Sequence, residues 1–336
     1  MTASAAENAL HVPVLLDECL ELLGPALTGD AVMIDCTLGM GGHTQGVLDA
    51  FPNVTVVGID RDPEAIRLAS ERLAGYGDRF QAVHATYDDV DLVASRFGTD
   101  GRVDAILMDL GVSSLQLDDA ARGFSYAQDA PLDMRMDSST GITAQEILAT
   151  SSAREIARIL ATYGEEKFAK RIADRIVARR ETAPLTRTSE LADLVRDSIP
   201  AAARRTGGNP AKRTFQALRI AVNNELSVLE DAIDRAIESI RVGGRIVVES
   251  YQSLEDRIVK EAFAVGTSST TPAGLPMELE DHKPFLTALT RGAMKADDTE
   301  IARNPRSASV RVRAVERTRQ TPAHLGRADI NRGDKK

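Results

Sequence analysis

Short apolar runs alternate with amphipathic segments through the first third of the chain. The runs at residues 31–36, 54–60, 80–84 and 103–109 have the pattern of buried strands. After the second run, Asp62 and Pro63 predict a helix start, with Asp62 as N-cap and Pro63 in the first turn. Residues 90–97 predict another helix. Alternating strands and helices predict a parallel sheet covered by helices on both faces.

The pattern changes after residue 120. No strand pattern is visible up to residue 215, and four stretches have helical periodicity: 143–150, 153–163, 165–180 and 189–199. The α/β pattern then returns with a long helix (216–240), a strand (243–250), a helix (254–263), a loop (266–276) and an antiparallel strand pair (285–290 and 309–315). We therefore predict a sheet domain from 1–119 and 216–316, a helical insert from 120–215 and a disordered basic tail from 317–336.

Composition favours a globular protein over a membrane-spanning one. The 336 residues are 43% hydrophobic and 27% charged, as in globular proteins, and no apolar run is long enough to span a bilayer. The start has no leader-like pattern, which predicts a cytoplasmic protein without membrane contact. Cys19 and Cys36 are interpreted as buried side chains, with neither a disulfide nor a metal site.

Charge alone does not identify a partner. The net charge of −9 argues against nucleic acid, but residues 301–336 contain ten lysines and arginines against three acids. The stretch 204–213 is also basic. Either a local nucleic-acid surface or a solvated surface with a basic tail fits this distribution.

A glycine-rich turn at residues 39–42 follows the first strand and precedes a helix, the geometry of a nucleotide-type site. The dinucleotide fingerprint fits poorly, because Thr44 stands at its third glycine position. The methyltransferase variant places acids at the ends of the first two strands, and Asp35 and Asp60 supply them; Asp60 would accept two ribose hydroxyls. This predicts S-adenosylmethionine, although such turns also occur without a ligand. His43 would contact the cofactor or act as a local cap.

The fourth strand ends at Asp109, at the same sheet edge as the glycine turn. An exocyclic amine is a weak nucleophile, and an acceptor on its N–H orients its lone pair toward a methyl donor. Asp109 is the first candidate for that acceptor, with Ser113 and Ser114 as secondary candidates. Asp109 would otherwise touch the cofactor's amino group or make an Asx-turn.

Several unusual strings resemble the RsmH (MraW) family of bacterial methyltransferases. They are Asp-Leu-Gly-Val-Ser-Ser at 109–114, Arg-Gly-Phe-Ser-Tyr at 122–126, Pro-Leu-Asp-Met-Arg-Met at 131–136, Arg-Thr-Phe-Gln-Ala-Leu-Arg-Ile at 213–220 and Ser-Leu-Glu-Asp-Arg-Ile-Val-Lys at 253–260. The resemblance covers residues 11–308. It implies a class I, Rossmann-like α/β fold with a mostly parallel seven-stranded sheet and an all-helical substrate-recognition insert.

The resemblance also implies a reaction and its site. Members use S-adenosylmethionine to methylate the N4 amine of a cytidine in the decoding region of 16S ribosomal RNA, so the small ribosomal subunit is the expected partner; a homodimer is left open. The positions that match the family's cofactor-binding residues are Gly41, Gly42, His43, Asp60, Tyr87, Asp109 and Gln116. The catalytic positions we assign are Asp109 and Ser113.

The chain departs from the family pattern at six positions. Asn209 and Gln252 replace histidines, Lys212 replaces a threonine, Leu115 replaces a proline and Tyr251 replaces a phenylalanine. Tyr87 also stands where phenylalanine is usual, still able to stack on an adenine ring. Asparagine and glutamine keep hydrogen bonding but do not titrate near neutral pH. A required histidine base at either position is therefore disfavoured.

Other charged residues have two readings each. Asp133, Arg135 and Asp137 would position a substrate loop or form an internal ion-pair network. Lys212 and Arg213 are candidates for phosphate contacts, while Arg219 would bind phosphate or pair with a neighbouring acid. A third group contains Glu255, Asp256 and Arg257. For these residues we prefer a role at the crevice edge over an exposed helix start.

Two rival functions remain at this point. A DNA or small-molecule amine methyltransferase would use the same fold. An RNA-binding assembly factor would keep the fold without the reaction.

Overall fold

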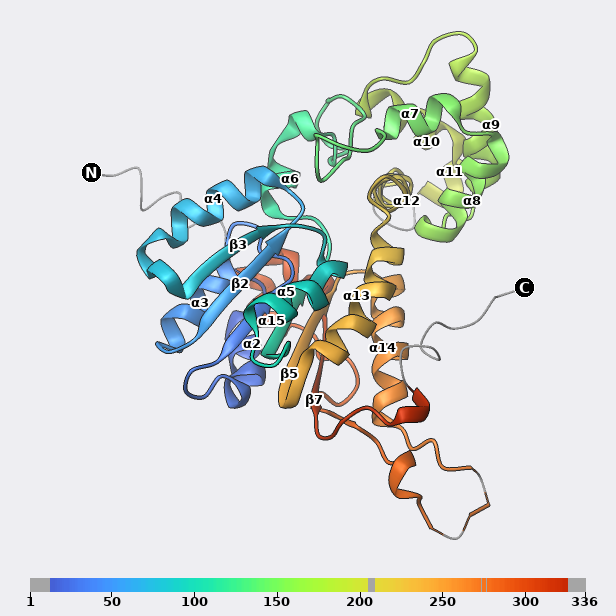
Figure 1. The fold of residues 1–336 in the computed structure, drawn as a ribbon. Coiled ribbons are helices and arrows are strands. Elements are labelled where there is room, and N and C mark those ends of the chain that lie inside the picture. The colour runs from blue at the N-terminus through green and yellow to red at the C-terminus, as the bar shows by residue number, and fades with distance from the viewer. Residues whose placement is uncertain (1–12, 205–208, 273, 276, 326–336) are drawn as a thin grey trace. The chain divides into compact units, whose positions relative to one another are not determined.

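The computed structural model describes residues 13–325 except 205–208, 273 and 276 (Figure 1). The chain divides into two compact units, which are described separately. The first contains residues 1–111 and 227–336, and the second contains residues 112–226.

A seven-stranded sheet forms the centre of the first unit. Its order is β3-β2-β1-β4-β5-β7-β6. The strands are β1 (Val32–Asp35), β2 (Thr55–Asp60), β3 (Phe80–His84), β4 (Val103–Asp109), β5 (Ile240–Ser250), β6 (Leu286–Ala288) and β7 (Arg311–Arg317). Pairing is parallel from β3 to β5, and β7 runs antiparallel to both β5 and β6. The predicted α/β fold class with a mostly parallel seven-stranded sheet is confirmed, and so is the antiparallel pair of late strands.

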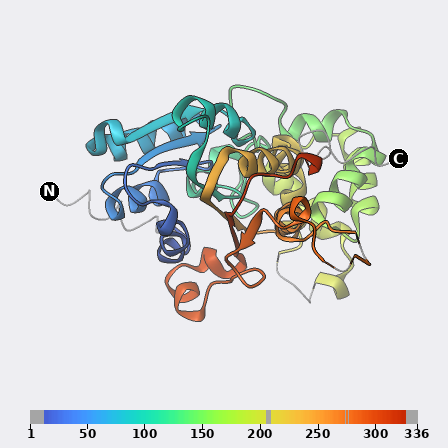
Figure 2. The same ribbon diagram turned by 60° about the horizontal axis from the view of Figure 1, so that its bottom comes forward.

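Helices cover both faces of this sheet (Figures 1 and 2). They are α2 (Leu16–Leu23), α3 (Gly42–Ala50), α4 (Pro63–Leu73), α5 (Val90–Phe97), α13 (Glu225–Ser239), α14 (Ser253–Thr267) and α15 (Asp298–Arg303). Alternate side chains of β4 enter different cores: Ile106 packs with the α5 and α13 side, and Leu107 packs with the α2 and α3 side. Asp62 caps α4 by accepting the Glu64 N–H, as predicted.

The second unit is helical. Its helices are α6 (Ser114–Asp118), α7 (Ala144–Thr150), α8 (Ala153–Gly164), α9 (Ala169–Arg180), α10 (Thr188–Ser198), α11 (Ala201–Arg204) and α12 (Lys212–Asn223). Helix α8 approaches α12 so closely that a Cβ on Gly164 would lie 2.5 Å from the Arg213 carbonyl oxygen. Capping boxes at Thr143 and Ser152 begin α7 and α8.

The single helix predicted over 216–240 is wrong. Two helices, α12 and α13, meet at Asn224, whose φ of 53° is left-handed. Asparagine adopts this conformation more easily than most residues, while the apolar periodicity continues across the break and conceals it. The expected domain limit between residues 215 and 216 falls inside α12, and the two units instead divide after residues 111 and 226.

The predicted disorder from residue 317 is wrong for the described part of that segment. Arg317 ends β7 and is 1% exposed, and residues 323–325 form a 3-10 turn. Arg311 and Arg313 both pair with Asp256. Several basic side chains near this end therefore form ion pairs or hydrogen bonds inside the fold. Residues 326–336 lie outside the described part of the chain.

No helix in the described part of the chain is both long and apolar enough to cross a membrane. The two cysteines are buried and unpaired, as predicted.

Candidate functional site

Four acidic residues end four neighbouring strands of the first unit. Asp35, Asp60, Asp109 and Glu249 lie at or next to the carboxyl ends of β1, β2, β4 and β5. In an open parallel sheet this edge is where ligands bind. The four acids nevertheless have different surroundings and different uses.

Asp35 stabilises its own loop. It is 1% exposed, its Oδ2 accepts the Thr44 hydroxyl at 2.7 Å, and its Oδ1 accepts the Thr37 N–H at 3.1 Å. Burial raises its pKa, while these hydrogen bonds and the nearby His43 lower it. Asp35 therefore stabilises the glycine turn through its hydrogen bonds. Thr44, which stands at the third glycine position of the dinucleotide fingerprint, is one of its two partners.

Asp60 is half-buried and joins the glycine turn to β2. Its Oδ2 accepts the Gly39 N–H at 2.8 Å, and its Oδ1 accepts the Asp62 N–H at 2.9 Å. Each carboxylate oxygen keeps a second lone pair, which suits two adjacent hydroxyl donors. Burial raises the pKa of Asp60 to about 6, although both N–H bonds oppose that rise.

The glycines of the turn are required by packing inside the protein. Gly41 has a φ of 77°, and a Cβ there would lie 2.8 Å from Cδ1 of Leu73. A Cβ on Gly42 would lie 2.7 Å from Cγ of Pro13. Glycine is therefore required at these two positions because α4 and Pro13 pack closely against the turn, whether or not a ligand also approaches it.

Asp109 and Glu249 are direct neighbours across β4 and β5. The Tyr251 hydroxyl donates to Oδ1 of Asp109 at 2.9 Å, and the Asp109 N–H donates to Oγ1 of Thr37 at 2.6 Å. The Asp109 side chain remains 29% exposed. This carboxylate is thus held in one orientation and still reachable, which a group that touches substrate requires.

Glu249 is fully buried, and neither of its carboxylate oxygens accepts a hydrogen bond from a nitrogen or oxygen donor of the described residues. The neighbouring polar side chain is the Cys19 thiol. Its Oε2 lies 3.3 Å from Nε2 of His43. Burial and the adjacent Asp109 raise the pKa of Glu249 well above its usual value.

His43 lies between these two acids. Its Nε2 is 2.9 Å from the Val14 carbonyl oxygen, which only accepts, so Nε2 carries a hydrogen. Its Nδ1 is 3.7 Å from Oδ2 of Asp109. Burial raises the pKa of Asp109, while His43 and the Tyr251 hydroxyl bond lower it. His43 thus lies behind Asp109, in a buried cluster that sequence reasoning did not anticipate.

Cys19 completes this cluster. One ligand-type atom from each of Cys19, His43 and Glu249 lies within 4.8 Å of the other two. Nε2 of His43, which lies 3.3 Å from Glu249, carries a hydrogen that it donates to Val14, so in this arrangement that nitrogen has no lone pair for a metal ion.

Tyr87 begins a 3-10 turn (Tyr87–Asp89) after β3 and packs, half-buried, on the sheet core. The other two predicted residues belong to the second unit. Ser113 accepts the Gln116 N–H at 3.3 Å, and Oε1 of Gln116 accepts the Ser113 N–H at 3.1 Å. This capping box begins α6 and gives both residues a structural use.

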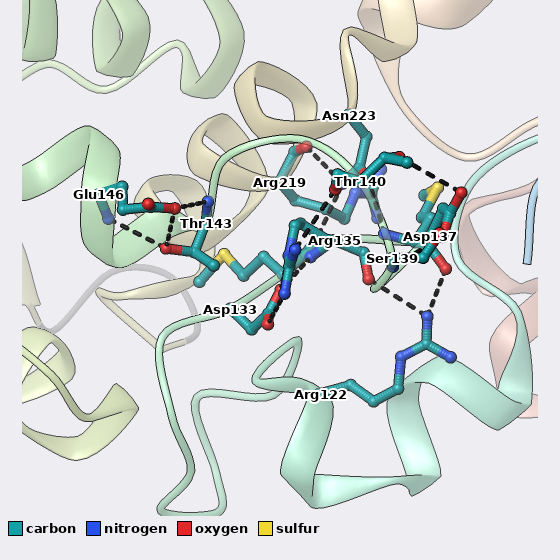
Figure 3. Close-up of polar contacts among 12 residues, drawn as sticks. Arg122, Asp133, Arg135, Asp137, Ser139, Thr140, Thr143, Glu146, Arg219 and Asn223 are labelled. Carbon is teal, nitrogen blue, oxygen red and sulfur yellow. Dashed lines mark hydrogen bonds and ion pairs between the residues drawn. The ribbon is translucent and has the colours of Figure 1, made fainter.

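Asp133, Arg135 and Asp137 belong to an internal network of the second unit (Figure 3). Arg135 makes two 2.8 Å bonds to Asp133, and Arg122 donates to the Arg135 carbonyl. Asn223 binds the backbone on both sides of Arg135, through Met134 O and Met136 N. Of the two readings offered by the sequence, the structure supports the ion-pair reading for Asp133 and Arg135. Asp137 instead accepts hydrogen bonds from Ser139 and Thr140 in its own loop.

Other candidate charges are also used by the fold. Arg219 makes a two-bond pair with Glu225, so the neighbouring-acid reading is confirmed. The preferred crevice role for Glu255 and Asp256 is not supported. Glu255 accepts the N–H groups of Tyr251 and Gln252, and Asp256 pairs with Arg311 and Arg313. Arg257 is exposed. At two of the departures from the family pattern, Asn209 caps its own turn and Gln252 donates to Glu255.

Sequence reasoning missed Glu249 and Tyr251. The signal was available, because Glu249 is an acid near the end of an apolar strand, as are Asp35, Asp60 and Asp109. For Tyr251 the sequence showed only that it replaces the family's phenylalanine, and only the pairing of β4 with β5 brings it to Asp109.

With this geometry in view, similarity to known proteins is informative. A profile of the MraW methylase family matches residues 8–318. The chain belongs to the MraW methylase family. Two similar proteins of that kind are the ribosomal RNA small subunit methyltransferases H of Beutenbergia cavernae and Streptomyces avermitilis. The first is 61% identical and covers 96% of both chains. The second is 57% identical and covers 92% of this chain and 98% of its own.

One solved structure illustrates a distant similarity. An rRNA methylase from Streptococcus thermophilus aligns with a TM-score of 0.43 and 10% identity over 92% of this chain and 99% of its own. Similarity at that level adds nothing to the family assignment.

As a MraW methylase, the protein is an S-adenosylmethionine-dependent methyltransferase, and its residues fit that cofactor. Asp60 offers free lone pairs for the two ribose hydroxyls beside the glycine turn. The cofactor supplies an electrophilic methyl group, and the chain's own residues bind and orient the reactants.

Cofactor affinity should fall below pH 6. The pKa of Asp60 is raised to about 6, so the acceptor carboxylate is ionised above that pH and is lost by protonation as the pH falls through it. If only the ionised form binds, affinity for S-adenosylhomocysteine drops about tenfold from pH 7 to pH 5. Isothermal titration calorimetry measures this change.

Two variants assign the pH effect. Asp60→Asn should bind weakly at both pH values and lose most of the pH dependence. His84→Gln serves as the matched control, because His84 is the Cα partner of Asp60 on β3. A flat wild-type profile, or a profile that His84→Gln flattens, would contradict the assignment to Asp60.

Proposed function

We propose that this methyltransferase methylates the N4 amine of a cytidine in the decoding region of 16S ribosomal RNA. Its substrate would then be the RNA of the small ribosomal subunit, in the cytoplasm. The relatives named above support a ribosomal RNA substrate, since they match over nearly their whole length. The observation that carries the chemistry is the orientation of Asp109 by Tyr251 at the carboxyl edge of the sheet.

The reaction places a defined demand on Asp109. The N4 lone pair of cytosine is delocalised into the ring, and a carboxylate that accepts one N–H localises it and aims it at the methyl group. The N4 nitrogen forms its bond to the methyl carbon as the carbon–sulfur bond breaks, and the extra proton leaves the nitrogen afterwards. The base must first leave its stack, which is easiest in RNA loops.

The remaining residue roles are part of the same proposal. Gly41, Gly42, Tyr87 and Gln116 would hold the cofactor together with Asp60, and Ser113 would assist Asp109. His43 would act from behind Asp109, since it is buried against Val14 and Glu249. The insert would recognise RNA, with boundaries at 112–226 as the structure divides the chain.

Mass mapping of ribosomal RNA tests the proposal. Cells lacking this protein should lose one N4-methyl group on a single cytidine of 16S RNA, and the purified protein with S-adenosylmethionine should restore it on their small subunits. An unchanged methylation map together with methyl transfer to DNA or a small amine would overturn the substrate. If the wild-type protein binds subunits and transfers no methyl group to any of these, it is an assembly factor.

A further inference from the structure

Helix α9 of the second unit carries a concentration of positive charge on its exposed face. Lys167, Phe168, Lys170, Arg171, Asp174 and Arg175 line a hollow of about 400 Å³. We call Lys167, Lys170, Arg171 and Arg175 the α9 cationic surface. In Figure 1, α9 lies at the outer edge of this unit.

Most of this charge is not neutralised. Lys170 pairs with Asp174, the one acid lining the hollow, and Arg175 lies 3.4 Å from the Ser198 hydroxyl. Lys167 and Arg171 are exposed and make no ion pair within the described part of the chain. Three positive charges, on Lys167, Arg171 and Arg175, therefore face solvent beside a single lysine–aspartate pair.

Other arginines of the same unit contrast with these. Arg135 pairs with Asp133, Arg187 pairs with Asp129, and Arg219 pairs with Glu225. The α9 cationic surface is thus a cluster of cations that mostly lack an ion-pair partner, in a unit where several other arginines are paired with acids.

The dipole of α9 does not favour the cations at its start. Its first turn contains Lys170 and Arg171 and no acid, although Glu166 accepts the Phe168 N–H just before the helix and Lys170 pairs with Asp174. The opposite face of the helix is firmly packed, with Ile172, Ala173 and Ile176 fully buried. The cations are therefore presented on a rigid support.

A second pair of cations extends this surface. Lys212 and Arg213, at the start of α12, are exposed. Arg213 donates to the Glu165 carbonyl at 3.0 Å, which places its guanidinium beside the segment that leads into Lys167. Two elements far apart in sequence thus contribute positive charge to one region.

We propose that the α9 cationic surface binds the phosphate backbone of the RNA substrate. This inference rests on the proposed function, because it assigns a docking surface to the same substrate. Phosphodiesters match a set of separated, solvated cations, and such contacts position RNA without reading its sequence. An acidic protein partner fits less well, because Phe168 is the only large apolar side chain lining the hollow and a stable protein interface needs an apolar centre.

A double charge reversal tests the surface. Lys167→Glu/Arg171→Glu changes two exposed residues without breaking an ion pair. We expect the KM for unmethylated small subunits to rise at least about tenfold, with kcat within about twofold and S-adenosylhomocysteine affinity unchanged. The slope of log affinity against log salt should fall by about two, because each lost phosphate contact removes about one.

The matched control is Arg154→Glu/Arg158→Glu on α8. These arginines are also exposed, four residues apart and in the same unit, so the change in net charge is identical. Lys167→Ala/Arg171→Ala, with circular dichroism of every variant, separates loss of binding from loss of folding. The inference is overturned if KM and salt slope stay at wild-type values, or if the α8 control shifts them equally.

Direct binding separates this inference from the proposed function. Fluorescence anisotropy with a labelled 16S RNA fragment measures RNA affinity, and so tests the α9 cationic surface even if no methyl group is transferred. Wild-type methylation with unchanged RNA affinity in the α9 variant would overturn only the surface. Absence of RNA methylation by the wild type, with affinity lost in the α9 variant, would overturn only the reaction.

Discussion

Replacing Asp109 by asparagine should lower kcat for RNA methylation by about 100- to 1,000-fold, the range for losing one preorganised polar group at a reacting centre. Asparagine has nearly the same shape, so the strand and its bond to Thr37 persist. It lacks the negative charge that accepts the amine N–H and meets the positive charge developing on nitrogen. Radioactive methyl transfer to unmethylated small subunits, at saturating cofactor, measures the loss.

Two comparisons sharpen this result. Tyr251→Phe removes the hydroxyl that orients Asp109 at 2.9 Å, and should cost about tenfold in kcat, since it leaves the carboxylate present but less constrained. Asp30→Asn removes an exposed acid of the same unit and should change nothing. If Asp109→Asn retains wild-type kcat, the carboxylate is not the acceptor. If its whole effect lies in cofactor affinity, Asp109 is a cofactor contact instead.

Replacing Arg317 by methionine should lower the free energy of unfolding of the sheet unit by about 3–5 kcal/mol, the usual cost of breaking a buried charged pair. The guanidinium is 1% exposed and donates to the carbonyls of Ile237 and Ile240 at 2.9 Å. It also lies 3.2 Å from a Glu238 carboxylate oxygen. Methionine fills similar volume but leaves these acceptors unsatisfied.

Urea unfolding, with amide hydrogen exchange of β5 and β7, measures this loss in the full chain. Exchange reports the sheet unit separately, which matters because a chain with two compact units need not unfold in one step. Arg319→Met is the control, because Arg319 is 31% exposed and its partner Glu280 is 70% exposed. That variant should lose less than about 1 kcal/mol. Equal stability of the Arg317 variant and the wild type would show that residue 317 belongs to a loose tail after all.

The sequence predicted the parts of the fold that depend on local patterns. The first four strands, the cap of α4 by Asp62 and the antiparallel pair near the end all follow from apolar runs and capping residues within a few positions of each other. Asp60 and Asp109 were found in the same way, since each acid directly ends a strand.

Long-range pairings were not predictable from those patterns. Charged residues near the crevice motifs suggested ligand contacts, yet Asp256 pairs with Arg311 and Arg313 about 55 positions later in the chain. Whether a charged side chain faces solvent or an ion-pair partner depends on which helices and strands pack together. That packing cannot be read from local sequence patterns or composition.

By itself, then, the sequence determined the sheet, the glycine turn with Asp60, the acceptor candidate Asp109 and the family. Only the tertiary structure decided that His43 lies between Asp109 and a buried Glu249, that Tyr251 orients Asp109, and that free positive charge gathers on α9. The physical reason is that local propensity acts over a few residues. The register of β4 against β5 and the packing of helices bring together side chains that lie far apart in the chain.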